Sequence, residues 1–88
     1  MYSTICRSEG IIWKIIDNEI ILLNPKTGEY FGLTPVASDF WKHLEKTSSL
    51  AEILTHLDSL YDVDKELLIN DIHVLITKLI QRNLIITE

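Results

Sequence analysis

The sequence contains little of what marks secreted or membrane-bound proteins. Cys6 is the single cysteine among 88 residues, so no internal disulfide can form and secretion gains no support. Residues 1–10 hold no apolar segment of signal-peptide length. The longest apolar runs, such as residues 20–23, are far too short to cross a membrane. We therefore expect a cytoplasmic protein.

The sequence also lacks a recognisable catalytic or metal site. Its three glycines lie in predicted turns or in a predicted strand and form no phosphate-binding loop. Cys6 has no base near it in sequence that would activate a thiol. Asp39 and His43 are four residues apart and could face one metal ion, but no third ligand lies nearby, so a solvated pair is the better interpretation. We predict no enzyme activity, no metal and no cofactor.

Basic residues are scarce, with eight Lys and Arg against 13 Asp and Glu and a net charge of -5. Duplex binding depends largely on basic side chains that neutralise phosphates, so this balance argues against nucleic acid as the partner. Hydrophobic residues, in contrast, make up 47% of the chain. A single small domain cannot bury all of them, which predicts an apolar groove or partner face on its surface.

Strand and turn signals predict a three-stranded antiparallel meander. The segments 11–16 and 19–24 are rich in β-branched and aliphatic residues, and Asp17-Asn18 between them suits a two-residue turn. A turn over 25–28 leads into the third strand, 29–33. The second strand is apolar on both faces, as expected at the centre of the sheet. The third strand then lies at an edge, which is either protected or used to capture a peptide.

Gly32 is the most informative residue of this third strand. By strand alternation, Phe31 and Leu33 share the face toward the helices, and Tyr30 and Gly32 share the other. A glycine inside a strand marks either the close approach of another backbone or a bulge. Both interpretations stay open at this point.

Three helices are predicted to follow the sheet. Their apolar spacing and their capping residues Thr34, Ser49 and Asp64 place them over 35–45, 50–60 and 65–82. The fold class is therefore α+β, with a three-stranded antiparallel sheet followed by three helices. We expect residues 1–10 to be a flexible N-terminus and residues 11–88 to form the domain.

The third helix has an unusually wide apolar arc. One stripe and its flank are formed by Leu68, Ile72, Leu75, Leu79, Ile69, Ile76 and Ile80. Leu67 and Val74 lie off this arc, and His73 borders it. Asn83 can adopt the left-handed conformation that ends a helix, and residues 84–86 then return toward the core.

Four segments, taken in order, resemble the pyrroloquinoline quinone synthesis protein D family. Residues 28–34 resemble its third strand and helix entry, and Phe40 to Leu44 its first-helix segment. Residues 49–54 and 61–63 resemble its second helix and connector, and the apolar spacing over 71–85 resembles its third helix. The resemblance covers about residues 11–86.

This resemblance implies a winged-helix-like domain that binds the leader of a ribosomally made precursor peptide. The leader would add a strand to the third strand, with its side chains in a cleft against the third helix. The implied backbone contacts are Glu29, Tyr30, Phe31, Gly32 and Leu33. The implied pocket is Leu68, Ile69, Ile72 and Ile76, with His73 at its border. The sequence does not determine which flank of the helix faces the cleft.

A chain of this size most resembles the leader-binding protein of lasso peptide pathways. Its implied partners are the precursor leader, a separate leader-cleaving cysteine protease and an ATP-dependent cyclase. Two other functions stay open: a winged-helix DNA-binding regulator, and an assembly domain whose edge strand pairs with a second copy. The first is weakened by the few basic residues of the predicted third helix.

Overall fold

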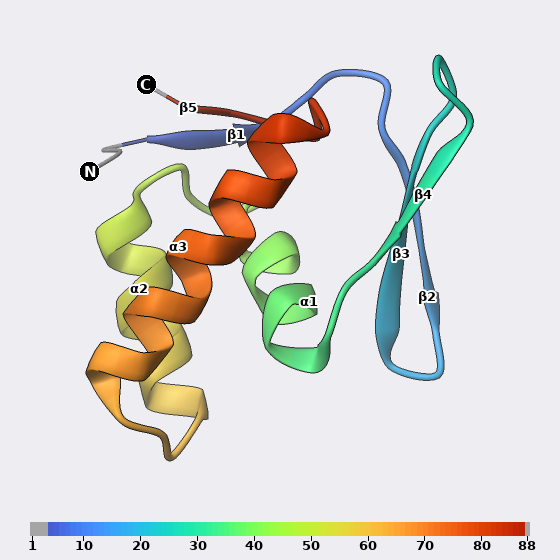
Figure 1. Ribbon diagram of the computed structural model, residues 1–88. Helices are drawn as coiled ribbons and strands as arrows, with labels where there is room; N and C mark the ends of the chain where they lie inside the picture. Colours follow the sequence, from blue (N-terminus) through green and yellow to red (C-terminus); the bar gives the residue numbers. More distant parts are fainter. Residues whose placement is uncertain (1–3, 88) are drawn as a thin grey trace.

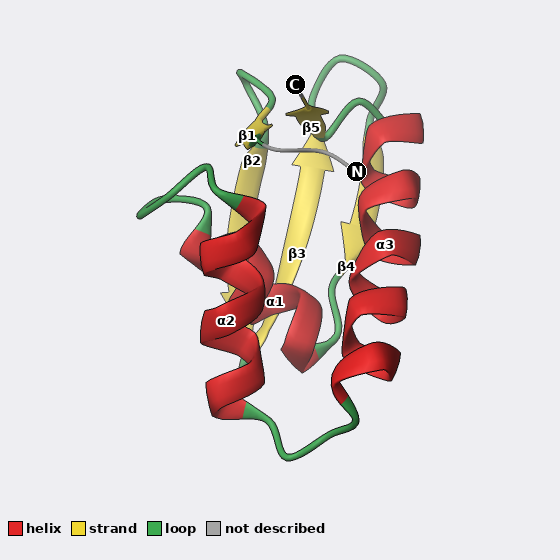
Figure 2. Ribbon diagram, turned by 90° about the vertical axis from the view of Figure 1, so that its left-hand side faces the viewer, coloured by secondary structure: helices red, strands yellow, loops and turns green. Residues whose placement is uncertain are grey.

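The computed structural model describes residues 4–87 and has the predicted α+β architecture. A three-stranded antiparallel sheet, in the order β2-β3-β4, is formed by Ile12–Ile16, Glu19–Asn24 and Glu29–Gly32. The helices α1 (Pro35–His43), α2 (Leu50–Leu60) and α3 (Lys65–Gln81) follow, and all three lie on one side of this sheet (Figure 1 and Figure 2). Both the fold class and the central place of the second predicted strand are confirmed.

The turns of the meander have the geometry that their residues predict. Asp17 and Asn18 have φ values of 52° and 68°, as a two-residue hairpin turn requires, and they join Ile16 to its partner Glu19. Gly28 ends the second turn with a φ of 76°. These left-handed residues fix the register of the sheet, because the turn length determines which residues pair.

The helices also begin where the sequence indicates. The Thr34 side chain accepts a hydrogen bond from the Ala37 backbone N–H, and Ser49 and Asp64 cap α2 and α3 in the same way. After α3, Asn83 has the predicted left-handed conformation, with a φ of 59°. Within residues 4–87, no helix combines the length and the apolar character that crossing a membrane requires.

The core lies between the inner face of the sheet and the three helices. Phe40 and Trp41 of α1 are fully buried there against aliphatic residues of every layer, such as Leu22 of β3, Ile53 of α2 and Leu79 of α3. Burial of each such side chain contributes about 1.5–3 kcal/mol. The sheet is therefore covered on one face only, by a single core that all the helices share.

The N-terminal segment differs from the flexible tail that we expected. Residues Ile5–Arg7 form strand β1, which pairs antiparallel with β5 (Ile85–Thr87) near the end of α3 (Figure 1). Ile5 is completely buried in the core, and its N–H donates to the Ser48 carbonyl at 2.8 Å. Cys6 lies in this strand as an exposed free thiol. Residues 1–3 lie outside the described part of the chain.

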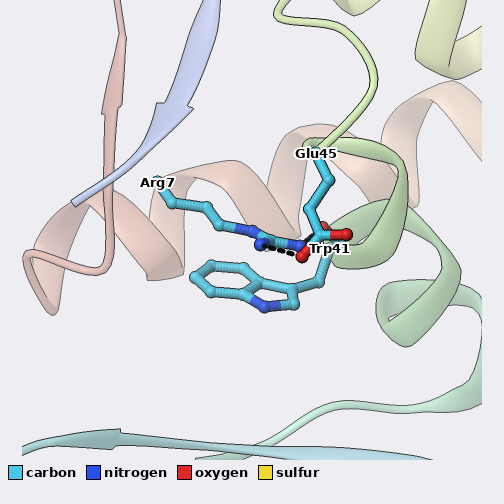
Figure 3. Close-up of polar contacts among 3 residues, drawn as sticks. All are labelled: Arg7, Trp41 and Glu45. Atoms are coloured by element: carbon cyan, nitrogen blue, oxygen red, sulfur yellow. Dashed lines mark hydrogen bonds and ion pairs between the residues drawn. The ribbon is translucent and has the colours of Figure 1, made fainter. Parts of the chain in front are cut away.

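Arg7 ties this N-terminal strand to the first helix. Its guanidinium donates to the Trp41 carbonyl and, at 3.1 Å, to a carboxylate oxygen of Glu45 (Figure 3). The same group lies over the Trp41 ring, 4.7 Å from its centroid, and 5.1 Å from the centroid of Trp13. A cation close to aromatic faces is held by both charge and packing. Three elements, β1, β2 and α1, are joined at this point.

Candidate functional site

Strand β4 has one edge without a strand partner. It pairs with β3 on one side, and among residues 4–87 no other strand pairs with it, because β5 pairs with β1 instead. The Leu33 N–H donates to the Ile20 carbonyl at 2.8 Å, so the backbone groups of this residue point toward β3. By alternation, the N–H and C=O of Tyr30 and Gly32 point toward the unpaired edge.

A buried serine holds this strand against the helices. The Ser38 hydroxyl accepts a hydrogen bond from the Ile20 N–H at 3.0 Å and donates to the Leu33 carbonyl at 3.3 Å. The hydroxyl thus stands in for a direct hydrogen bond from the Ile20 N–H to the Leu33 carbonyl. The other bond between these two residues, from the Leu33 N–H to the Ile20 carbonyl, is formed directly. This contact fixes the start of α1 next to the end of β4, and it fixes the floor of the groove described next.

A groove of about 440 Å³ lies between β4 and α3, beside the unpaired edge. Figure 2, seen from the side of the helices, shows α3 in front of β4. The groove is lined by residues of β4, the start of α1, the α2–α3 connector and one flank of α3: Phe31, Gly32, Leu33, Thr34, Val36, Ala37, Val63, Leu67, Leu68, Asp71, Ile72, Val74, Leu75 and Lys78. Most of these side chains are apolar, as is usual for a site that takes up another molecule's side chains.

Several apolar residues of the groove are exposed. Leu67 and Val74 on α3 expose 55% and 47% of their surface, and Val63 before the helix exposes 46%. Single exposed apolar residues are ordinary, but a cluster in a concave surface indicates an interaction site.

An ion pair joins the start of β4 to the end of α3. Glu29 at the start of β4 accepts a hydrogen bond from Arg82, just after α3, at 3.1 Å. The Arg82 guanidinium also lies over the Phe31 ring, 5.6 Å from its centroid. Since the start of β4 meets the end of α3 here, the strand and the helix run in opposite directions along the groove.

The structure brings together only part of the predicted peptide-binding set. Phe31, Gly32, Leu33, Leu68 and Ile72 all line the groove. Glu29 and Tyr30 lie on the same strand just before it, and Tyr30 is 70% exposed.

The remaining three predicted residues do not line the groove. Ile69 and His73 are half-buried elsewhere on α3, and Ile76 is fully buried in the core. Which residues contact a peptide stays a prediction for the whole set.

A neighbouring flank of α3 also faces the groove, and the predicted set did not include it. Leu67, Asp71, Val74, Leu75 and Lys78 come from this flank. One signal in the sequence could have found it. Leu67 and Val74 are apolar, lie off the main arc and are seven residues apart, which places both on the same side of the helix.

Two of the three histidines stack on each other. His43 of α1 and His56 of α2 stack with their ring centroids 4.1 Å apart and their planes 6° from parallel. Among residues 4–87, no group of three potential metal-ligating side chains comes together. Asp39, which the sequence analysis considered together with His43 as a possible metal ligand, accepts a hydrogen bond from the Tyr61 hydroxyl. That bond, together with burial and the charge of the carboxylate, raises the pKa of Tyr61 to about 12.

The histidine stack should make the fold sensitive to acid. Burial lowers the pKa of His43 below its ordinary value of about 6.5; His56 and Lys46 add to the shift, and Glu52 opposes it. Below this ordinary value the unfolded chain binds the proton more readily than the folded chain, so stability falls as the pH falls. Between pH 7.5 and pH 5.5, we expect the urea midpoint to fall less for His43→Gln than for the wild type. If the urea midpoint fell equally in both proteins, His43 would have no part in the acid sensitivity.

Comparisons with known proteins agree with the fold. The family described as coenzyme PQQ synthesis protein D (PqqD) matches residues 19–85. The chain is 31% identical to the solved structure "TbiB1 in Complex with the TbiA(beta) Leader Peptide", with a TM-score of 0.83 over 91% of this chain and 93% of that one. It is 25% identical to "Lasso peptide synthetase B1 complexed with the leader peptide", with a TM-score of 0.83 over 96% and 99%. No curated protein matches significantly.

Proposed function

The chain belongs to the coenzyme PQQ synthesis protein D (PqqD) family, and from this premise we propose that it binds the leader segment of a ribosomally made precursor peptide. The leader adds a strand to the unpaired edge of β4, and alternate side chains enter the groove against α3. The observation that carries this proposal is the placement of free backbone groups at Tyr30 and Gly32 directly beside an apolar groove. The likeness to two solved leader complexes supports it.

The energetics suit reversible binding. Ordering a disordered segment costs about 2–5 kcal/mol, so backbone pairing alone gives weak affinity. Each large apolar side chain that becomes buried in the groove contributes about 1.5–3 kcal/mol. Two such side chains offset the ordering cost. The net free energy of binding then comes from the backbone hydrogen bonds. This balance allows a carrier both to hold its peptide and to release it.

We propose further that the chain acts as a carrier in a lasso-type pathway in the cytoplasm. It presents the bound precursor to a separate cysteine protease, which removes the leader, and to an ATP-dependent cyclase. The chain itself performs no reaction in this scheme and needs no cofactor. The resemblance to a lasso peptide synthetase B1 supports this assignment.

A peptide titration tests the proposal directly. The probe is the fluorescently labelled N-terminal half of a small precursor encoded beside this chain, and its anisotropy is followed at 50 mM and 500 mM salt. Apolar strand addition should change affinity little between the two conditions. DNA binding, in contrast, should fall steeply with salt because counterions are released from phosphates. Salt-sensitive binding of duplex DNA without any binding of the peptide would refute the proposal.

Val74→Asp should weaken leader binding at least tenfold. Val74 lines the groove and is already 47% exposed, so a carboxylate there leaves the core intact but removes apolar contact with the peptide. Thr77→Asp is the matched control, since it adds the same charge to an exposed position of α3 outside the groove. We expect near wild-type affinity for this control. Equal affinities for the two variants, both folded by circular dichroism, would show that the peptide binds elsewhere.

A further inference from the structure

The groove between β4 and α3 has a charge at two points of an otherwise uncharged lining. Among residues 4–87, Asp71 and Lys78 are the only charged residues that line it. Both are exposed, and neither takes part in an ion pair within residues 4–87. The lining therefore presents one carboxylate and one ammonium group to whatever occupies it.

Neither charge is neutralised by its neighbours on the helix. The side chains three and four positions from Asp71 are all apolar: Leu67, Leu68, Val74 and Leu75. Lys78 has Val74 and Leu75 on one side. On the other it has the uncharged Gln81 and Arg82, whose charge is engaged by Glu29. Both groups are thus available to a ligand at short range.

The spacing of the two charges matches an extended peptide. Seven residues of helix separate Asp71 from Lys78, which corresponds to about 10.5 Å along the axis. In a strand, side chains on one face recur every second residue, or about every 6.6 Å. Two groove-facing residues four positions apart span about 13 Å, and the long lysine side chain covers the difference. One further groove-facing residue of the peptide lies between these two, opposite the apolar lining of the groove.

The direction of the peptide follows from the strand. Antiparallel pairs are more common and slightly more stable than parallel ones, so an added strand should run opposite to β4. Because Glu29 contacts Arg82, Lys78 lies toward the start of β4, and Asp71 lies toward its end. An antiparallel peptide passes Asp71 first and Lys78 second.

We propose that this groove selects a leader segment with the order basic-x-apolar-x-acidic. The basic side chain pairs with Asp71, the apolar one enters the groove, and the acidic one pairs with Lys78. This specificity rests on the proposed function, since it requires strand addition to β4. Asp71 and Lys78 thereby determine which leader binds when several leaders have a similar apolar content.

A random dodecapeptide library displayed on phage tests this specificity. Peptides are selected on the immobilised full chain, and those also retained by Gly32→Pro are discarded as not bound at the edge. The remaining peptides should be enriched about fivefold in the basic-x-apolar-x-acidic order, the combined effect of two exposed ion pairs. The variant with Asp71→Lys and Lys78→Asp should select the reverse order of charges.

The matched control exchanges two exposed charges outside the groove, by Lys42→Asp and Asp58→Lys, at the same net charge. It should select the wild-type order. If edge-bound peptides show no charge order, or if the order does not reverse in the groove variant, the proposed specificity is wrong while leader binding stands. If no peptide binds better to the wild type than to Gly32→Pro, strand addition itself is refuted.

Discussion

Gly32→Pro should lose at least tenfold in affinity for the leader and still fold. The Gly32 N–H points toward the unpaired edge of β4, since the Leu33 N–H bonds to β3. Proline removes this donor and places a ring where the added strand must approach. One lost hydrogen bond with its unsatisfied partner costs about 1–3 kcal/mol, which is about 5- to 160-fold in affinity, and the ring that obstructs the added strand brings the expected loss to at least tenfold. The ladder with β3 loses nothing, so circular dichroism should match the wild type.

Gly32→Ala is the control for this variant. Its Cβ would meet the Ile21 Cδ1 atom at 3.6 Å, an ordinary contact, and the backbone donor is kept. We expect affinity within about twofold of the wild type, because no hydrogen bond is lost. Isothermal titration with the leader peptide measures both variants. A folded proline variant that binds as well as the alanine variant would exclude the edge of β4 as the site.

Ile5→Ala should destabilise the fold by about 2–5 kcal/mol. Ile5 is completely buried, and the lost side chain leaves a cavity beneath the β1–β5 pair. Domains of this size are stable by only about 5–15 kcal/mol in total, so the change is severe. Urea unfolding at pH 7.5, followed by circular dichroism, gives the difference directly.

Cys6→Ser is the neighbouring control. The thiol is exposed in the same strand, so the substitution should change stability by no more than about 0.5 kcal/mol. If Ile5→Ala were equally harmless, β1 would contribute nothing to the core. The N-terminus would then behave in solution as the flexible tail that the sequence led us to expect.

The local signals of this sequence predicted most of the fold. Asp17-Asn18 and Thr34 act through their own backbone neighbours, so their effects are visible in a few consecutive residues. The β1–β5 pair was not visible in this way. Each strand has three residues, too few to show alternation, and Ile5 pairs with Thr87 from the other end of the chain.

The groove lies against the two elements that carry the predicted peptide-binding residues, but part of its lining comes from a flank of α3 outside that set. The apolar arc of α3 is wide because the helix packs against both α2 and β5, so the pattern alone does not separate core from groove. Ile76 is fully buried because it lies on the face of α3 that packs into the core. The flank of α3 that faces the groove carries residues such as Leu67 and Lys78. These residues line a groove only because β4 lies opposite them, and the helix pattern does not show where β4 lies.

The pairing of β1 with β5 has a consequence for engineering. It brings Ile5 directly opposite Thr87, and neither strand lines the groove. A short flexible linker can therefore join the two ends, and new termini can be opened in an exposed turn such as Asp17-Asn18. For the same reason, a larger host protein can accommodate the whole unit within one of its surface loops, with both connections leaving from one place.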